Sequence, residues 1–323
     1  MSRIVPVIDL TPYRDGRDKA AVAKQVGEAC ATIGFLVVRG HGISQATIDN
    51  MREATRQFFA LPYEAKATIR PSDPAVFRGY NGMETKSLGK SLGTDAPPDL
   101  RESFTVNRVQ DKSDPYFRSP AAGMIFADNV WPGDDLVPGF QEAYTAYYLA
   151  MDALATTMMR IFALALDLPE HVFDDKVDKH FSNCSAYHYP PLTQAPRPGQ
   201  LRGGAHTDFG SLTLLDTFPS ARGLQVRNGA DWEDVPLEPD TFVVNLGDLM
   251  AQWTNDRWVS TMHRVINPPE AAWNISRYSI AFFHQPNYDM LVESLDRANP
   301  PKYQPVTSGA HLMRKLSAMR VKV

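Results

Sequence analysis

The segment 205–215 carries the two residues with the clearest potential for chemistry. His206 and Asp208 are two positions apart and precede an apolar run rich in residues that favour β-strands. Residues i and i+2 of a strand point to the same face, so the imidazole and the carboxylate should converge. The same pair is also compatible with a buried, hydrogen-bonded histidine beside an ordinary turn aspartate. A metal site at this position therefore needs a third ligand from elsewhere in the chain.

His263 is the candidate for that third ligand. It follows Asp208 after an interval of 54 residues, which is long enough for several strands to return the chain beside the pair. Two histidines and one carboxylate form a facial triad that suits Fe(II) and leaves coordination positions open for substrates and O2. A structural zinc site would instead close its coordination with four protein ligands.

Arg277 and Ser279 supply a second candidate binding element. They lie two positions apart at the start of the run 277–283, which is rich in β-forming residues, so they should share a strand face. A guanidinium can hold a carboxylate through two charge-assisted hydrogen bonds, and the hydroxyl adds a donor. Alone, Arg277 would equally suit an ion pair with a nearby acidic residue on the surface. Beside a metal triad, the pair predicts a receptor for a carboxylate.

The composition is that of an ordinary globular protein. The chain has 323 residues, of which 43% are hydrophobic, and a formal net charge of -4. It is therefore long enough for one large domain or two medium ones. The charges form no blocks, so nothing indicates a nucleic-acid track or a polybasic membrane patch. We expect a small-molecule partner, with neither nucleic acid nor membrane, and we predict no particular oligomeric state.

The cysteine content and the N-terminal segment favour a cytoplasmic protein. Cys30 and Cys184 form no CxxC pattern, so a disulfide framework or a zinc site has no support, and a reducing compartment fits best. The first residues lack the apolar run of a signal peptide. The most apolar longer stretch, 153–166, contains Arg160 and is too short to span a bilayer.

The hydrophobic pattern predicts helices in the first half of the chain and short strands in the second. Turn signals separate the apolar runs after residue 182, which favours an antiparallel sandwich or barrel over βαβ units. The composition of residues 70–135 predicts long loops. Helices are expected over about 17–33, from Ser44 to Leu61, and over about 140–166; strands are expected over 35–38, 102–106, 212–215, 224–226, 242–246, 263–266 and 278–283.

The joint pattern of His-x-Asp, a later His and Arg-x-Ser resembles the iron(II)- and 2-oxoglutarate-dependent oxygenases. The likeness is to the branch that contains isopenicillin N synthase, and it covers most of the chain. The segments that look like this branch are 5–10, 34–43 and 58–62 in the N-terminal region and 189–191, 223–226, 245–248 and 263–265 in the barrel.

This resemblance implies a mainly β fold with α-helices, in which a double-stranded β-helix (jelly-roll) core has flanking helices, including the long one around 140–166. It also implies an enzyme that uses Fe(II), 2-oxoglutarate and O2 to hydroxylate, desaturate or cyclise a small molecule, releasing succinate and CO2. The implied metal ligands are His206, Asp208 and His263, and the implied contacts to 2-oxoglutarate are Arg277, Ser279 and Tyr189.

The resemblance further implies three regions in one structural unit. Residues 1–135 form the mixed N-terminal region, 136–290 form the long helix and the catalytic core, and 291–323 form a C-terminal segment. Five residues are candidate substrate contacts, each of which would also suit a packing role. They are Phe209 beside the ligand pair, Gln225, Phe283 on the face of Arg277, and Arg101 and Phe104 in a segment that resembles the pocket cover of this branch.

Two departures from the family pattern leave alternatives open. The family often has an asparagine two residues before the tyrosine of its Tyr-Pro segment, and Tyr187 stands there in this chain, so we assign Tyr187 no cosubstrate role. Isopenicillin N synthase uses no 2-oxoglutarate and has a glutamine near its C-terminus, whereas this chain ends Met-Arg-Val-Lys-Val. An Fe(II) oxidase of the same fold that does not use 2-oxoglutarate is therefore one alternative. A non-catalytic ligand-binding barrel is another, although it would not need the complete set of residues.

Overall fold

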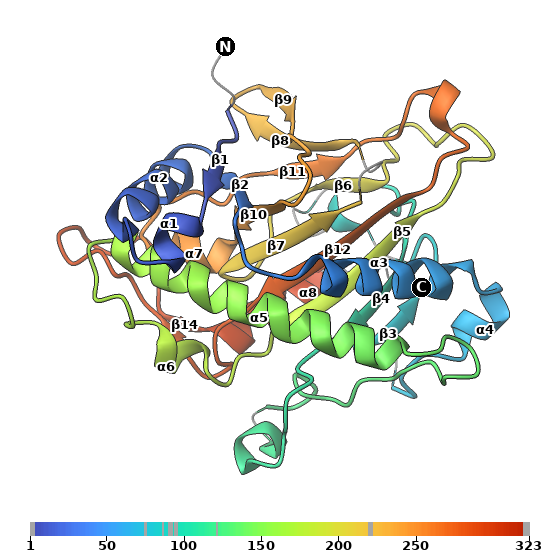
Figure 1. The fold of residues 1–323 in the computed structure, drawn as a ribbon, viewed down its shortest axis with the longest axis horizontal. Coiled ribbons are helices and arrows are strands. Elements are labelled where there is room, and N and C mark those ends of the chain that lie inside the picture. The colour runs from blue at the N-terminus through green and yellow to red at the C-terminus, as the bar shows by residue number, and fades with distance from the viewer. Residues whose placement is uncertain are drawn as a thin grey trace.

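A sheet of eight strands forms the middle layer of the molecule (Figure 1). Its strand order is β1-β2-β10-β7-β12-β5-β4-β3, and all neighbours are antiparallel except β1 and β2. The computed structural model describes residues 4–73, 76–85, 87–89, 93, 96–120, 122–218 and 222–318. The strands are β1 (Val7–Asp9), β2 (Phe35–Arg39), β3 (Gly79–Asn81), β4 (Glu102–Val106), β5 (Asn183–Tyr189), β7 (Leu212–Thr217), β10 (Phe242–Leu246) and β12 (Arg277–His284).

A second, four-stranded antiparallel sheet packs against one face of the large sheet. One buried apolar cluster contains Phe35, Val37 and Val243 of the large sheet together with Val226 and Val265 of the small one. The two sheets therefore enclose a common interior, as the predicted sandwich or barrel requires. The strand order of the small sheet is β6-β11-β8-β9, with β6 (Gly203–His206), β8 (Leu224–Asn228), β9 (Asp231–Asp234) and β11 (His263–Val265); β13 (Leu291–Val292) and β14 (Val306–Thr307) form a separate pair.

Helices α2 (Lys19–Thr32), α3 (Gln45–Ala60) and α5 (Phe140–Ala165) cover the other face of the large sheet (Figure 1). Along β2 the side chains alternate, so that Leu36 and Val38 join the core beneath the helices while Phe35 and Val37 face the small sheet. The predicted mainly β fold with flanking helices, including the long one, is confirmed. The helices are α1 (Thr11–Arg14), α2 (Lys19–Thr32), α3 (Gln45–Ala60), α4 (Tyr63–Ala67), α5 (Phe140–Ala165), α6 (Asp174–Val177), α7 (Asp248–Trp253) and α8 (Ser308–Ala318), with short 3-10 helices at Pro115–Arg118 and Glu270–Ala272.

The long helix α5 is apolar because it packs in the core. By length and composition alone its 26 residues are sufficient to cross a membrane. The apolar stretch 153–166, which was expected to be too short to span a bilayer, is only part of this helix. Phe140, Tyr144, Met151 and Phe162 are nevertheless fully buried inside the protein. These side chains form the helical face of the main core, so α5 is accounted for as a core helix.

Local sequence signals account for the helix ends. The Ser44 hydroxyl accepts a hydrogen bond from the Thr47 backbone at 3.1 Å and caps α3. After α2, Gly34 has a φ of +65°, and a Cβ at this position would lie 2.1 Å from the Val259 carbonyl oxygen. Glycine is therefore required where the chain leaves α2 and enters β2.

Some elements differ from the sequence-based expectations. His206 and Asp208 do not lie on one strand. Strand β6 ends at His206, Asp208 lies in the turn that follows, and β7 begins at Leu212. Strand β3 lies inside the region expected to be loops, and helix α8 lies in the C-terminal segment, for which no helix was predicted. The division at residue 135 stays a prediction, and strands β1 to β4 belong to the same sheet as β5, β7, β10 and β12.

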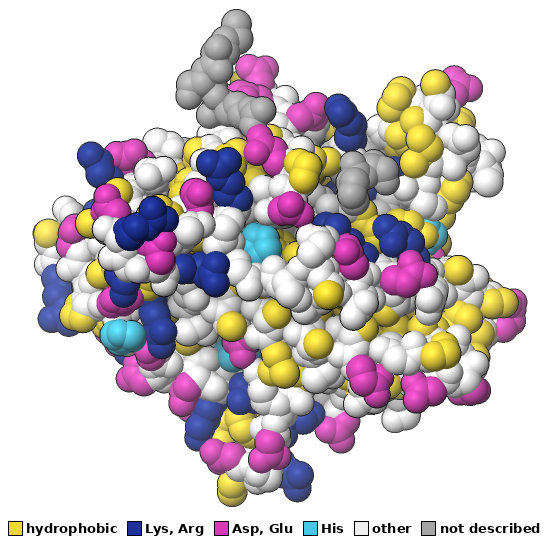
Figure 2. Space-filling model, viewed as in Figure 1, with side chains coloured by type: hydrophobic (Ala, Val, Ile, Leu, Met, Phe, Trp, Pro, Cys, Tyr) yellow, Lys and Arg dark blue, Asp and Glu magenta, His cyan; other side chains and the backbone are white. Residues whose placement is uncertain are grey.

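Charged side chains are mixed over the surface. Figure 2 shows lysine and arginine interspersed with aspartate and glutamate on the visible face, without a large area of one sign. This pattern agrees with the even distribution of charge along the sequence.

Phe104 of β4 provides a test of the helix-side core. Its side chain is fully buried, and its ring lies 4.8 Å from Phe58 and 5.0 Å from Phe140 between centroids. We predict that Phe104→Ala lowers the free energy of unfolding by about 3–5 kcal/mol, because the cavity cannot collapse among rigid rings. Urea denaturation measures this change. As a control, Leu149→Ala on the exposed side of α5 should change the free energy of unfolding by no more than about 0.5 kcal/mol. Equal losses in the two variants would contradict the assignment of Phe104 to the helix-side core.

Candidate active site

The pairing of β6 with β11 brings the predicted ligands together. His263 lies opposite His206 in the register of these strands, and Asp208 follows in the turn after β6. The Asp208 Oδ1 atom is 3.7 Å from His206 Nε2 and 3.8 Å from His263 Nε2. Two atoms that bind one metal at about 2.0–2.2 Å lie no more than about 4.4 Å apart. Both distances are within that limit, so the donor set fits a divalent ion.

Two glycines let the turn that carries Asp208 pack tightly. A Cβ on Gly210 would lie 2.3 Å from the His284 carbonyl oxygen, and one on Gly247 would lie 2.2 Å from the Gly210 carbonyl oxygen. The Asp248 amide donates to the Asp208 carbonyl oxygen at 2.8 Å. This close backbone contact explains why glycine occupies both positions, and it fixes the turn in space.

Hydrogen bonds orient both imidazoles. The Nδ1 atom of His206 lies 2.8 Å from the Gly204 carbonyl oxygen, and that of His263 lies 3.2 Å from the Thr261 carbonyl oxygen. Because a carbonyl only accepts, each Nδ1 carries the proton and donates it. Each Nε2 lone pair is then free to bind a metal.

The environment keeps Asp208 ionised and His206 neutral. Burial raises the pKa of Asp208, but the electrostatic effect of the two imidazoles, His263 first, and the hydrogen bonds from Asn245 and Thr213 outweigh burial and leave that pKa below its usual value. Burial, followed by the charge of His263, lowers the pKa of His206 to about 3. Asp208 Oδ2 accepts from Thr213 Oγ1 at 2.5 Å and from Asn245 Nδ2 at 2.7 Å, so Oδ1 remains for the metal.

Arg277 lies in the interior between the two sheets. It is 2% exposed, its Nη1 donates to Ser279 Oγ at 3.1 Å, and its guanidinium lies 4.6 Å from the centre of the Tyr189 ring. In the described part of the chain its Nε has no hydrogen-bond partner, and no carboxylate lies within ion-pair distance of it. A buried charge without a counter-ion is costly. The site therefore fits a ligand that brings its own carboxylate.

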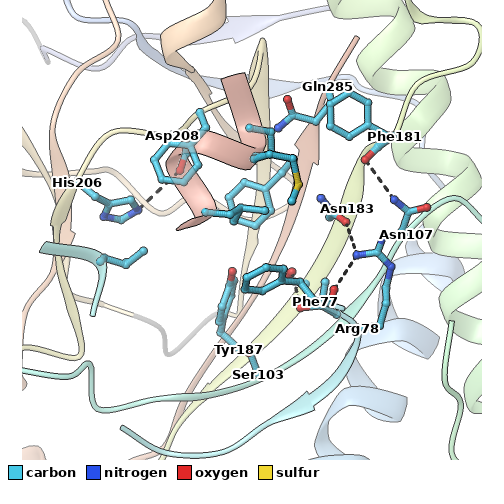
Figure 3. Close-up of a pocket in the computed structure, with 18 of the residues that line it drawn as sticks. Phe77, Arg78, Ser103, Asn107, Phe181, Asn183, Tyr187, His206, Asp208 and Gln285 are labelled. Carbon is cyan, nitrogen blue, oxygen red and sulfur yellow. Dashed lines mark hydrogen bonds and ion pairs between the residues drawn. The ribbon is translucent and has the colours of Figure 1, made fainter. Parts of the chain in front are cut away.

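A cavity of about 170 Å³ begins beside the triad and extends to the far ends of β4 and β5 (Figure 3). His206 and Asp208 border it on one side, and Arg78, Asn107 and Asn183 on the other. Its walls are mainly apolar between these two ends. The apolar lining residues include Phe77, Met124, Ile125, Phe181, Phe209, Phe283, Leu312, Met313 and Leu316.

Three of the five candidate substrate residues line this cavity, namely Arg101, Phe209 and Phe283. The other two assignments are corrected. Phe104 belongs to the core beneath the helices, because Arg101, Ser103 and Thr105 occupy the face of β4 toward the cavity and Phe104 occupies the opposite face. Gln225 lies outside the interior, where its amide donates to Asp234 at 3.0 Å, because Leu224 and Val226 take the inward positions of β8.

Several lining residues escaped the sequence analysis. The sequences of β4 and β5 could have predicted some of them, because small polar residues alternate there with apolar ones and therefore define a polar face. In α8 the apolar residues recur at helical spacing, which indicates a helix but not that it faces the cavity, and the loop before β3 has no periodic pattern. The missed residues include Ser103, Thr105, Asn107, Asn183 and Ser185 from the strands, Phe77 and Arg78 from the loop, and Leu312, Met313 and Leu316 from α8.

Family models match both halves of the chain. The model described as the non-haem dioxygenase in morphine synthesis N-terminal region matches residues 5–134. The model of the 2OG-Fe(II) oxygenase superfamily matches residues 180–286, which hold all three triad residues and Arg277.

Curated relatives share about a third of their residues with this chain over almost its full length. A 2-oxoglutarate-dependent dioxygenase, citB, of Monascus ruber is 35% identical over 91% of this chain and 88% of its own. A homoarginine-6-hydroxylase of Glycine max is 33% identical over 97% of this chain and 96% of its own.

Solved structures match to a similar extent. A full-length Neurospora crassa protein in complex with alpha-KG and thymine has a TM-score of 0.83 at 30% identity, covering 97% of this chain and 96% of that one. A putative 2OG-Fe(II) oxygenase family protein from Caulobacter crescentus has a TM-score of 0.83 at 28% identity, covering 98% and 99% of the two chains.

The first prediction for this site concerns Asp208, the ligand that carries charge. Asp208→Ala should lower Fe(II) affinity by more than about 100-fold, since even the loss of a hydrogen-bond partner behind a ligand costs about 10–100-fold. Anaerobic titration calorimetry with Fe(II) measures the affinity, and circular dichroism checks the fold. Asp231→Ala in the exposed β8–β9 hairpin is the matched control and should bind as the unmodified protein does. Full affinity in Asp208→Ala would rule out this ligand.

The second prediction concerns the amide behind Asp208. Asn245→Ala should weaken Fe(II) binding by about 10–100-fold, because Asp208 Oδ2 loses a donor that orients the carboxylate. The same calorimetric titration measures the change. Asn228→Ala, an exposed position on β8, serves as the control. Equal affinities for the two variants would show that Asn245 does not position the ligand.

Proposed function

The chain belongs to the 2OG-Fe(II) oxygenase superfamily, and from this premise we propose that it oxidises a C–H bond of a compact, mostly apolar small molecule held in the cavity. The sequence-based resemblance is confirmed by the relatives described above. The protein is accordingly an enzyme that uses Fe(II), 2-oxoglutarate and O2.

We assign Fe(II) to His206, Asp208 and His263. The neutral imidazoles and single carboxylate leave a net positive charge on the occupied site, which favours an anionic cosubstrate. When bound, Fe(II) and 2-oxoglutarate supply the oxidising chemistry, in which R–H, O2 and 2-oxoglutarate become R–OH, succinate and CO2. The protein holds three coordination positions and leaves the remainder open.

We assign the distal carboxylate of 2-oxoglutarate to Arg277. The Ser279 hydroxyl lies beside the guanidinium, and the Tyr189 ring packs on it, so both would hold Arg277 in one orientation. Arg101 interacts electrostatically with both His206 and Arg277, which indicates that the carboxylate receptor and the triad border the same interior space. The single observation that carries the proposal is this buried, uncompensated arginine in the same interior as an open triad.

The size of the cavity limits the substrate. An engineered protein cavity of about 150 Å³ accommodates benzene, and the cavity here measures about 170 Å³. A molecule of one ring with short substituents therefore fits. The Neurospora structure contains thymine, a single-ring compound, and its match over nearly the whole chain supports a substrate of this size. Leu312, Met313 and Leu316 of α8 would shield the reacting position from water.

The two alternative functions are less well supported. An oxidase that does not use 2-oxoglutarate is not favoured, because the curated relatives are named as 2-oxoglutarate-dependent and solved relatives contain alpha-KG. A non-catalytic barrel would have no use for the complete set of ligands and carboxylate receptor.

We further propose that the enzyme acts in the cytoplasm, without nucleic-acid or membrane partners. Both Cys30 and Cys184 are free and buried, which suits a reducing compartment. The mixed surface charge in Figure 2 offers no basic track for nucleic acid on the visible face.

The proposed function predicts a spectroscopic signature. Anaerobic protein with Fe(II) and 2-oxoglutarate should develop the weak visible charge-transfer band of the chelate, and admission of O2 should release succinate. Arg277→Met should raise the dissociation constant for 2-oxoglutarate by about 10–150-fold, because a charge-assisted hydrogen bond contributes about 1.5–3 kcal/mol. Titration of the band with 2-oxoglutarate measures the dissociation constant of the unmodified protein and that of Arg277→Met.

Arg227→Met on the exposed edge of β8 is the matched control for this experiment. It should leave the 2-oxoglutarate affinity unchanged. Folded, iron-loaded protein that forms no band would overturn the proposed function, and unaltered affinity in Arg277→Met would overturn the assignment of the carboxylate receptor.

A further inference from the structure

We propose that the molecule oxidised by this enzyme, its prime substrate, carries a carboxylate that binds Arg78 at the end of the cavity remote from the triad. The inference rests on the proposed function, since it takes the cavity to be the site of the prime substrate. It adds the charge of that substrate and the direction in which it lies.

Arg78 is a buried cation at the cavity wall. It directly precedes β3, lines the cavity and is 5% exposed. Its Nη1 donates to the Phe77 carbonyl oxygen at 2.7 Å and to Asn183 Oδ1 at 3.3 Å, while its Nη2 donates to the Ile125 carbonyl oxygen at 2.7 Å. These acceptors hold the guanidinium in place, but all of them are neutral. Its Nε atom has no hydrogen-bond partner among the residues that the structure describes.

The charge of Arg78 is not compensated within the described residues. None of their carboxylates lies within ion-pair distance of it. Burial lowers the pKa of this guanidinium to about 10, so Arg78 is still a cation at neutral pH. A buried cation held only by dipoles pays a desolvation penalty that a bound anion would reduce.

The other charges on the described cavity walls already have partners. Arg101 Nη2 lies 3.6 Å from Asp99 Oδ2, and Asp208 is assigned to Fe(II). With the site loaded, the charges of Fe(II), Asp208, 2-oxoglutarate and Arg277 are +2, -1, -2 and +1, and they cancel. Of the charged groups on the described cavity walls, Arg78 is then the one without an opposite charge beside it.

Arg202 is another buried arginine for which the described chain supplies no carboxylate, but it does not line the cavity. Its Nη2 donates to the carbonyl oxygens of Pro190 and Ile275, and it interacts electrostatically with Arg277 and Tyr189. It therefore belongs to the cosubstrate end of the interior. Arg277, with Arg202 at the same end, therefore matches the distal carboxylate of the cosubstrate, and Arg78 matches a separate carboxylate on the prime substrate.

A carboxylate suits this position better than a phosphate. A monoanion balances one guanidinium, whereas a dianion would leave a buried negative charge among mainly apolar walls. Asn107 Oδ1 and Gln285 Oε1 also belong to the cavity lining and are acceptors that no described group satisfies, so they would disfavour further anionic oxygens and would accept from a donor on the substrate.

The position of Arg78 also sets the direction of the substrate. Figure 3 shows Arg78, Asn107 and Asn183 on the opposite side of the cavity from His206 and Asp208. A carboxylate bound there directs the rest of the molecule toward the metal. Oxidation should thus occur at the apolar end of the substrate and not at the carbon next to its carboxylate.

Matched acids and amides test the proposal. The probes are phenylacetate, 3-phenylpropionate and cyclohexylacetate, each compared with its primary amide, which has nearly the same shape but no charge. Each probe is titrated into anaerobic enzyme loaded with Fe(II) and 2-oxoglutarate, and the change in the visible band gives the dissociation constant. At least one acid should bind about 10-fold or more tightly than its amide, since charge-assisted hydrogen bonds are roughly twice as strong as neutral ones.

Two variants test whether Arg78 causes this preference. Arg78→Met removes the cation and should make acid and amide bind equally. Asn183→Asp retains the shape of the side chain and places an internal carboxylate next to the Arg78 guanidinium, so it should abolish the preference in a folded protein. Arg118→Met, an exposed arginine, is the matched control and should keep the preference. If Arg78→Met does not fold, Asn183→Asp decides.

Three outcomes would overturn the inference: equal binding of acid and amide in every pair, no binding of any acid, or a preference that survives in Asn183→Asp. These outcomes are separate from failure of the proposed function. Absence of the 2-oxoglutarate band in unmodified protein counts against the function itself, whereas a normal band with no acid preference counts against the role of Arg78 alone.

Discussion

The pairing of His206 with His263 across β6 and β11 is the contact on which the site depends. It joins residues far apart in the sequence, and the close-packed turn at Gly210 and Gly247 then presents Asp208 to both imidazoles. The three ligands are therefore positioned by backbone hydrogen bonds and not by side-chain packing alone. Such a site is organised before a metal arrives, so little reorganisation opposes binding.

The large sheet separates two tasks through the alternation of its side chains. On β12, Ile280 and Phe282 face the helices and stabilise the fold, while Arg277 and Ser279 face the interior and are available for binding. Strands β4, β5 and β10 divide most of their side chains in the same way, although His188 and Glu102 lie 2.7 Å apart on the helix side. Polar groups can thus line the interior without weakening the core, because the apolar contacts that stabilise the sheet lie on its other face.

Much of this arrangement could be predicted from the sequence because its signals are local. Alternation on strands, the Ser44 cap and the Arg-x-Ser spacing need only a few residues each. The single strand expected around His206 and Asp208 was wrong in detail, since the break at Gly210 depends on contact with His284, which is distant in the chain. Phe104 and Gln225 do not contact the cavity, because the alternation along β4 and β8 turns them to the strand faces away from it. The role of α8 and of the loop at Arg78 depends on tertiary packing and has no short-range signature.

Helix α8 closes one wall of the cavity but contributes none of the proposed ligands of iron or 2-oxoglutarate. An ion pair, Lys315 with Asp248 at 2.7 Å, ties it to the residue whose amide supports the Asp208 turn. One wall of the pocket is thus supplied by a segment of the chain that is separate from the proposed iron and 2-oxoglutarate ligands. Substitutions in α8 can therefore change which substrates fit the cavity without changing the residues proposed to bind iron and 2-oxoglutarate.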